Sequence, residues 1–154
     1  MRSRIRFMLL VFCVAGVVDW ASAQQPILRV RVEPRTVVVG EPVKVTVDVL
    51  VPTWFTKAPT YPRLEIPGAI AVLRKGPSLN LIERIDGDTW AGISRSYLVY
   101  SQEQKLYTLP PAEVEVIYAR EGTQSSQPVR LKFPPRTFEA RIPDEAAGLD
   151  YFIA

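Results

Sequence analysis

The chain has 154 residues, with 19 Lys and Arg against 16 Asp and Glu, no histidine, one cysteine and a net charge of +3. This length is typical of one domain with its own hydrophobic core. The lack of histidine removes the usual general base near neutral pH and the commonest transition-metal ligand, and the near balance of charge excludes the strongly basic surface of a nucleic-acid-binding protein.

Residues 1–23 have the three-part pattern of a secretory signal peptide. Three arginines precede an apolar run from Phe7 to Val18, and Ala21-Ser22-Ala23 supplies a small-residue cleavage site. The run has about 12 residues, whereas a membrane-spanning helix needs roughly 20. We therefore expect cleavage after Ala23 and export to the periplasm or cell envelope. Retention of the segment as a membrane anchor is the alternative.

The mature chain is predicted to fold on its hydrophobic core alone. The single cysteine, Cys13, leaves with the signal peptide, so no disulfide can form. Loss of three arginines and Asp19 leaves 16 basic and 15 acidic residues, a net charge of +1. We expect no nucleic-acid partner and no membrane span in the mature chain.

Period-two alternation of apolar and polar residues begins at Ile27 and predicts strands at Ile27–Glu33, Thr36–Val39 and Val43–Val51. The third strand has valine at every odd position. Because valine is stiff at χ1 and suits a pleated surface, we expect these five side chains in the core. Lys44, Thr46 and Asp48 are then predicted to face water.

Four prolines between Thr53 and Pro67 remove backbone donors, so this segment is predicted to be a long connection or an edge strand. It carries three large aromatic residues, Trp54, Phe55 and Tyr61. Aromatic side chains on a loop are frequent binding anchors, which makes these three the candidate partner-binding residues. The alternative is that they cap the end of the fold.

The rest of the chain continues the pattern of short strands. Asp86-Gly87 is the residue pair favoured by a type I′ hairpin turn, and the strand that follows it is predicted to be central, with Trp90 in the core. Strands are predicted at Ile70–Arg74, Leu79–Ile85, Thr89–Tyr100, Leu106–Leu109, Glu113–Tyr118, Val129–Phe133 and Thr137–Ile142.

This succession of short strands with prolines between them predicts an all-β fold, an immunoglobulin-like antiparallel β-sandwich over residues 24–143. A closed barrel is the structural alternative. Residues 144–154 are predicted to be a C-terminal tail, the start of a truncated linker.

Carboxylates are the only side chains left for catalysis or metal binding, and their placement is unfavourable. Glu113 and Glu115 lie two apart on one predicted strand and share a solvent face, whereas a glycosidase needs two acids facing each other across a cleft. Asp86 and Asp88 bracket a turn glycine, and a calcium ion needs about six oxygens. We therefore predict no enzyme activity, no catalytic residue, no metal and no cofactor.

Two segments carry a family resemblance. The run from Trp90 to Tyr100, followed by Tyr107-Thr108-Leu109-Pro110-Pro111, resembles the BatD-type aerotolerance (oxygen tolerance) family, and the opening over residues 32–43 is similar to the start of that family's exported region. The resemblance implies a periplasmic scaffold with tandem β-sandwich domains, tethered to the membrane beside von Willebrand A-domain membrane proteins and a MoxR-like ATPase. This chain is shorter, with one such domain.

The resemblance implies a non-enzymatic protein-protein interaction module whose partners are envelope proteins, with von Willebrand A-domain membrane proteins as the named candidates. The alternative is a β-sandwich that binds carbohydrate or peptidoglycan, in which Trp54, Phe55 and Tyr61 stack on sugar rings.

Overall fold

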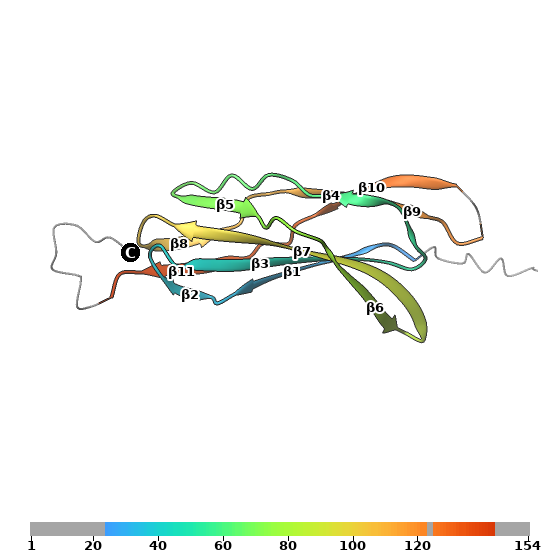
Figure 1. The fold of residues 1–154 in the computed structure, drawn as a ribbon, viewed down its shortest axis with the longest axis horizontal. Helices are drawn as coiled ribbons and strands as arrows, with labels where there is room; N and C mark the ends of the chain where they lie inside the picture. Colours follow the sequence, from blue (N-terminus) through green and yellow to red (C-terminus); the bar gives the residue numbers. More distant parts are fainter. Residues whose placement is uncertain (1–23, 123–124, 144–154) are drawn as a thin grey trace, which may run out of the picture.

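The computed structural model describes residues 24–122 and 125–143, and these residues form strands and connecting turns (Figure 1). The predicted signal peptide (1–23) and C-terminal tail (144–154) lie outside the described residues. The strands within the described ranges are β1 (Ile27–Glu33), β2 (Thr36–Val38), β3 (Pro42–Val51), β4 (Phe55–Thr60), β5 (Ala69–Leu73), β6 (Leu79–Ile85), β7 (Asp88–Ser101), β8 (Lys105–Thr108), β9 (Glu113–Ala119), β10 (Ser126–Lys132) and β11 (Thr137–Arg141).

The strands form two layers, which confirms the predicted β-sandwich. The first layer has the order β1-β3-β7-β5, with β6 also paired to β7, and every pair in it is antiparallel. The second layer contains the sets β4-β9-β10 and β8-β11-β2. One pair, β2 with β11, is parallel, so the predicted antiparallel arrangement holds except at this point.

Two proline pairs interrupt the second layer without shifting it. Glu113 pairs with Lys132 in β9 and β10, and Thr108 pairs with Thr137 in β8 and β11. Four residues separate these paired ends on each strand, so the register continues unchanged across the gap. Each side of the gap contains two consecutive prolines, which have no N–H to donate and so stop the ladder. The pairs are Pro110-Pro111 and Pro134-Pro135.

The core lies between the layers, and β3 supplies its centre. The five odd-numbered valines of β3 are fully buried, as the alternation predicts. Full burial of a valine contributes about 1.5–3 kcal/mol. Opposite them, the second layer contributes buried residues that include Val114, Val116 and Phe138. Phe138 stacks on Tyr107 with ring centroids 4.9 Å apart, so the β8–β11 end belongs to the same core.

The hairpin between β6 and β7 has the predicted turn. Asp86 and Gly87 both have positive φ, at 52° and 92°, and Ile85 pairs with Asp88 across them. Strand β7 has paired neighbours on both sides, which confirms that it is central. Trp90 is buried, also as predicted.

The outer face of the first layer differs from the prediction. Lys44 is exposed, but Thr46 and Asp48 are buried, and Asp48 is only 3% exposed. Figure 1 shows that β6 and the first half of β7 curve away from the second layer, on the side of β1 and β3. The expectation that Thr46 and Asp48 face water was wrong because neighbouring strands provide polar partners and cover on this face.

Strand β4 forms where the proline-rich segment was predicted to be a connection or an edge. It lies at the edge of the second layer, paired to β9 with irregular register. Its Pro59 is buried, while the residues on either side, Ala58 and Thr60, are exposed. The edge interpretation is confirmed for Phe55–Thr60, and the remaining residues to Pro67 form a connection with one isolated bridge at Ile66.

Replacing Phe138 with alanine tests whether the β8–β11 end shares one cooperative core with β3. We expect Phe138→Ala to lower the free energy of unfolding by about 3–5 kcal/mol, because it deletes a buried ring and leaves a cavity. Leu106→Ala, in the adjacent strand and exposed, should change it by less than about 0.5 kcal/mol. Urea unfolding followed by circular dichroism measures both. Equal, small effects would contradict a shared core.

Candidate binding surface

The three aromatic residues singled out from the sequence do not form one exposed group. Trp54 is 59% exposed, immediately before β4. Phe55 and Tyr61 are partly buried and pack against the core. Trp54 and Tyr61 lie at opposite ends of β4, separated by roughly 20 Å of strand. Only Trp54 is therefore free to contact a partner with most of its ring.

The hydroxyl groups of Tyr61 and Tyr97 tie the proline-rich segment to the first layer. The Tyr61 hydroxyl donates to the carbonyl of Ile93 at 3.2 Å, and the Tyr97 hydroxyl donates to the carbonyl of Pro62 at 2.6 Å. Burial raises the pKa of Tyr97 to about 12, against the smaller opposing effect of the nearby Arg95 guanidinium. Burial also raises the pKa of Tyr61, opposed by the same guanidinium. These groups therefore act as structural donors at neutral pH.

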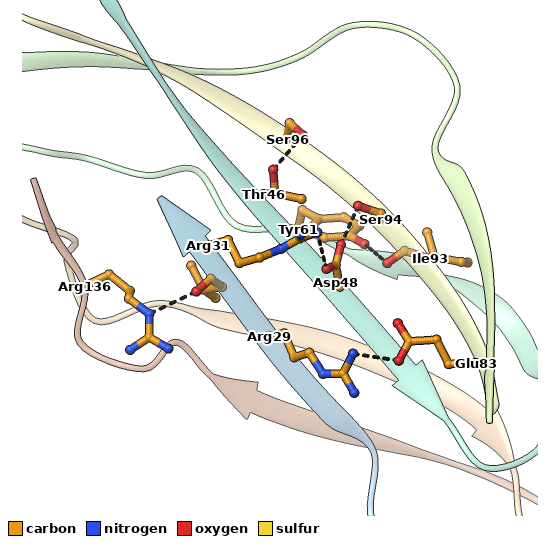
Figure 2. Close-up of polar contacts among 11 residues, drawn as sticks. Arg29, Arg31, Thr46, Asp48, Tyr61, Glu83, Ile93, Ser94, Ser96 and Arg136 are labelled. Atoms are coloured by element: carbon orange, nitrogen blue, oxygen red, sulfur yellow. Dashed lines mark hydrogen bonds and ion pairs between the residues drawn. The ribbon is translucent and has the colours of Figure 1, made fainter. Parts of the chain in front are cut away.

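The register of the first layer places a polar network in the middle of its outer face. Arg29, Asp48, Ser94 and Leu79 occupy one row across β1, β3, β7 and β6. The buried Asp48 carboxylate accepts from Ser94 Oγ at 2.5 Å and from Arg31 at 2.8 Å (Figure 2). A buried carboxylate needs such partners, because burial without them is costly. The network consequently fixes how β1, β3 and β7 lie against one another.

Further polar contacts flank this network. Thr46 and Ser96 approach each other with their hydroxyl oxygens 3.4 Å apart in the next row (Figure 2). On the other side, Arg29 of β1 pairs with Glu83 of β6 at 2.7 Å. This ion pair connects the first and last strands of the curved row. It therefore closes one end of the outer face.

An insertion separates β5 from β6 although both pair with β7. Leu73 pairs with Tyr97 and Leu79 with Ser94, so five residues on the edge lie opposite two on β7. The insertion is Arg74-Lys75-Gly76-Pro77-Ser78. Its base is held by the Arg74 N–H, which donates to the Ser96 carbonyl at 2.9 Å, and by Arg95, which donates to the Arg74 carbonyl at 3.0 Å. Such bulges redirect side chains at a sheet edge.

A hollow of about 460 Å³ lies between this insertion and the outer face of β1, β3 and β7. This volume is within the range of small ligand sites. We call it the cationic hollow because five of the residues that line it are basic and one is acidic. These charged residues are Arg31, Lys44, Arg74, Lys75, Arg95 and Glu33. The excess positive charge at this point contrasts with the near balance over residues 24–154, which contain 16 basic and 15 acidic residues.

Exposed apolar side chains gather beside the cationic hollow. Among the described residues, six large hydrophobic side chains are exposed, and four of them belong to β5 and β6: Ile70, Val72, Leu79 and Ile82. The register pairs Ile70 with Tyr100 and Val72 with Leu98. We call Ile70, Val72 and Leu79 the apolar edge, because the register places these three side chains on the outer face. Ile82 pairs with Ala91, in the row of the buried Val51, and therefore lies on the other face of the sheet. Leu79 lines both the apolar edge and the cationic hollow.

The carboxylates considered from the sequence have ordinary structural surroundings. Glu115 lies 4.0 Å from Arg130, its partner across β9 and β10, and Glu113 lies opposite Lys132. Asp88 accepts a hydrogen bond from Gln24. Within residues 24–122 and 125–143, no three His, Cys, Asp or Glu side chains are grouped so that they could hold a metal ion.

The cationic hollow was missed in the sequence because its residues come from four separate segments. The signal that could have found it is the run Arg74-Lys75-Gly76-Pro77, which places two basic residues on a turn between two predicted strands. That Lys44 and Arg31 lie on the same face follows from alternation, but their position beside this turn depends on the order of strands in the sheet.

Comparisons with family models, with curated proteins and with solved structures gave no match. Over the described ranges, the structure contains no helix of the length and hydropathy needed to cross a membrane.

Replacing Ser94 with alanine tests the buried polar network. We expect Ser94→Ala to lower the free energy of unfolding by about 1.5–3 kcal/mol, because the Asp48 carboxylate loses a hydrogen bond in a buried position. Ser96→Ala, two residues along the same strand face, should cost about 0.5 kcal/mol because its contact is long and between neutral groups. Urea unfolding measures the difference. Similar losses for both variants would contradict the role assigned to Asp48.

Alkaline titration tests the buried tyrosines. The folded pKa of Tyr97 lies above its ordinary value of 10.0, so the folded state keeps a proton that the unfolded state releases. The contribution of this group to stability is complete below pH 10 and is lost as pH rises to about 12. We expect Tyr97→Phe to make the fall in unfolding free energy with pH less steep. An unchanged slope in this variant would count against burial of the hydroxyl.

Proposed function

We propose that this domain is a non-enzymatic interaction module of an exported protein, which acts in the periplasm or cell envelope. The observation that carries the proposal is the apolar edge. Three of the six large exposed hydrophobic side chains of the described residues lie on the outer face of two strands that both pair with β7. Exposed apolar side chains gathered on one face mark sites of protein-protein contact.

The strand arrangement supports an immunoglobulin-like variant of the β-sandwich. The N-terminal segment contributes β1 to the first layer and β2 to the second, where β2 runs parallel to β11. Such a domain needs no catalytic residues to act, since it can function through the surfaces that its two layers present. This arrangement supports surface recognition as the function.

We propose further that the module is related to the periplasmic part of BatD-type aerotolerance proteins. Trp90, which is central to the resemblance, is buried on β7, and Tyr107 stacks on Phe138. Trp90 and Tyr107, which carry the resemblance, are therefore buried and contribute to the fold. The partner that this relation favours is a von Willebrand A-domain membrane protein, bound through the apolar edge.

The carbohydrate-binding alternative has less support. It needs several aromatic rings on one accessible surface, whereas Phe55 and Tyr61 pack against the core and Tyr61 is further held by its hydrogen bond to Ile93. A single exposed ring at Trp54 provides little area for stacking.

Capture from the host's envelope fraction tests the proposal. We expect the immobilised full chain to retain a von Willebrand A-domain protein, identified by mass spectrometry. The double variant Ile70→Ser/Val72→Ser should retain at least tenfold less, because it removes two side chains of the apolar edge. Leu106→Ser, which changes a leucine on β8 that is more exposed than either residue, should retain as much as the unmodified chain. The absence of such a protein, or equal retention by both variants, would contradict the proposal.

A further inference from the structure

We propose that the cationic hollow binds an acidic, extended segment of the partner protein. The inference rests on the proposed function, since it takes the occupant to be part of a protein, and it names the chemistry of that occupant. The carboxylates of the segment would face Lys44, Arg74 and Lys75. Apolar side chains next to them in the same segment would lie on Val72 and Leu79.

Unpaired charge is the first argument. In the portion of the chain that the structure describes, ion pairs neutralise Arg29, Arg31, Lys105, Arg130 and Arg141. Lys44, Arg74 and Lys75 form no ion pair among the described residues, although Glu33 lies opposite Lys44 across β1 and β3 and all three cations line one hollow. The lining offers one carboxylate, Glu33, for this group. A cleft lined by one sign of charge attracts a ligand of the opposite sign.

Spacing is the second argument. Lys44 is on β3, and the insertion lies beyond β7, so their backbones are two strand spacings apart, or about 10 Å. This distance is close to the Debye length of about 8 Å at physiological ionic strength. The fields of these cations therefore overlap within the hollow. Carboxylates placed between them would interact with more than one cation.

The fixed insertion is the third argument. The two hydrogen bonds at its base hold Arg74 against β7. Gly76 has a φ of 122°, a backbone conformation that residues with a side chain rarely adopt. The insertion thus stands as a wall on one side of the hollow, and the curved sheet forms its floor. The distance from β1 to the insertion is about three strand spacings, or roughly 14 Å, which matches about four residues of extended chain.

The same shape favours a peptide over a membrane surface. The basic side chains line a recess between the insertion and the sheet, where a narrow chain can enter. A flat layer of phospholipid headgroups would meet the rim first. The apolar edge beside the recess also offers contacts to the side chains that flank an acidic run. Binding to anionic lipid is therefore the competing outcome of the test.

The test uses the full chain and a labelled peptide, acetyl-Leu-Glu-Glu-Glu-Glu-Leu-amide. The control is the same peptide with its four Glu residues replaced by Gln. Fluorescence anisotropy should show binding of the Glu peptide and at least tenfold weaker binding of the Gln peptide. Raising the salt from 50 to 300 mM should weaken binding of the Glu peptide at least fivefold, because the attraction is screened.

Two double variants with the same change in net charge locate the site. Lys44→Gln/Lys75→Gln should weaken binding of the Glu peptide at least tenfold. Lys57→Gln/Lys132→Gln, on the exposed surface of the second layer, should weaken it less than twofold. Circular dichroism checks that both variants are folded. Equal losses in the two variants, or equal binding of the Glu and Gln peptides, would overturn the proposal.

Vesicles of phosphatidylglycerol provide the remaining comparison. If they retain the chain in a manner that depends on Lys44 and Lys75 while the Glu peptide does not bind, the hollow recognises lipid and the proposal is wrong. If the Glu peptide does not bind but the Ile70→Ser/Val72→Ser variant still fails to capture the partner protein, the acidic-segment proposal is wrong and the proposed function stands. If the Glu peptide binds but the unmodified chain captures no von Willebrand A-domain protein, the proposed function is wrong.

Discussion

Strand β3 lies in the middle of the first layer, and the burial of its five valines determines the position of every other residue on that layer. Together these side chains contribute on the order of 10 kcal/mol, which is comparable with the net stability of a domain. A register slip by one residue would turn them outward and bring Lys44 and Asp48 into the core. The alternation of β3 therefore fixes which side chains of β1 and β7 share its outer face, because these strands pair with it residue by residue.

The outer face is built on this constraint. Next to the valines, Asp48 is held by Ser94 and Arg31, and this network keeps the three strands in a fixed relation where the sheet curves. The insertion between β5 and β6 then adds cations at the rim, and the two edge strands expose apolar side chains. Under the proposed function, the inner face provides stability, whereas the outer face combines the stabilising Asp48 network with the surface proposed for recognition. Changes at exposed positions of the outer face, such as Lys44, are therefore tolerated better than changes among the valines or at the buried Asp48 and Ser94.

Much of the fold could be predicted because it depends on local signals. Alternation gave the positions of β1, β3 and β9, and the pair Asp86-Gly87 gave the hairpin, whose turn residues both have the positive φ that this turn needs. Trp90 was correctly predicted to be buried, although it lies on the same face of β7 as Ser94 and not among the valines. The facing proline pairs could not be predicted as partners, because their alignment depends on the register of strands that are distant in sequence.

The candidate site was harder to predict. Trp54, Phe55 and Tyr61 are close in sequence, but strand formation at β4 separates the first from the last, and only Trp54 stays exposed. Asp48 was assigned to solvent because alternation identifies the side of a sheet and gives no information on what covers that side. Lys44 and the insertion meet through the strand order, for which the sequence carried no local signal.

Hydrogen exchange of the full chain with and without its captured envelope partner tests most directly whether the outer face of the first layer is the binding face. The account predicts slower amide exchange over residues 69–85, which contain the apolar edge and the insertion, with the exchange of β8 and β11 unchanged. Slower exchange confined to β4, or to β8 through β11, would contradict it.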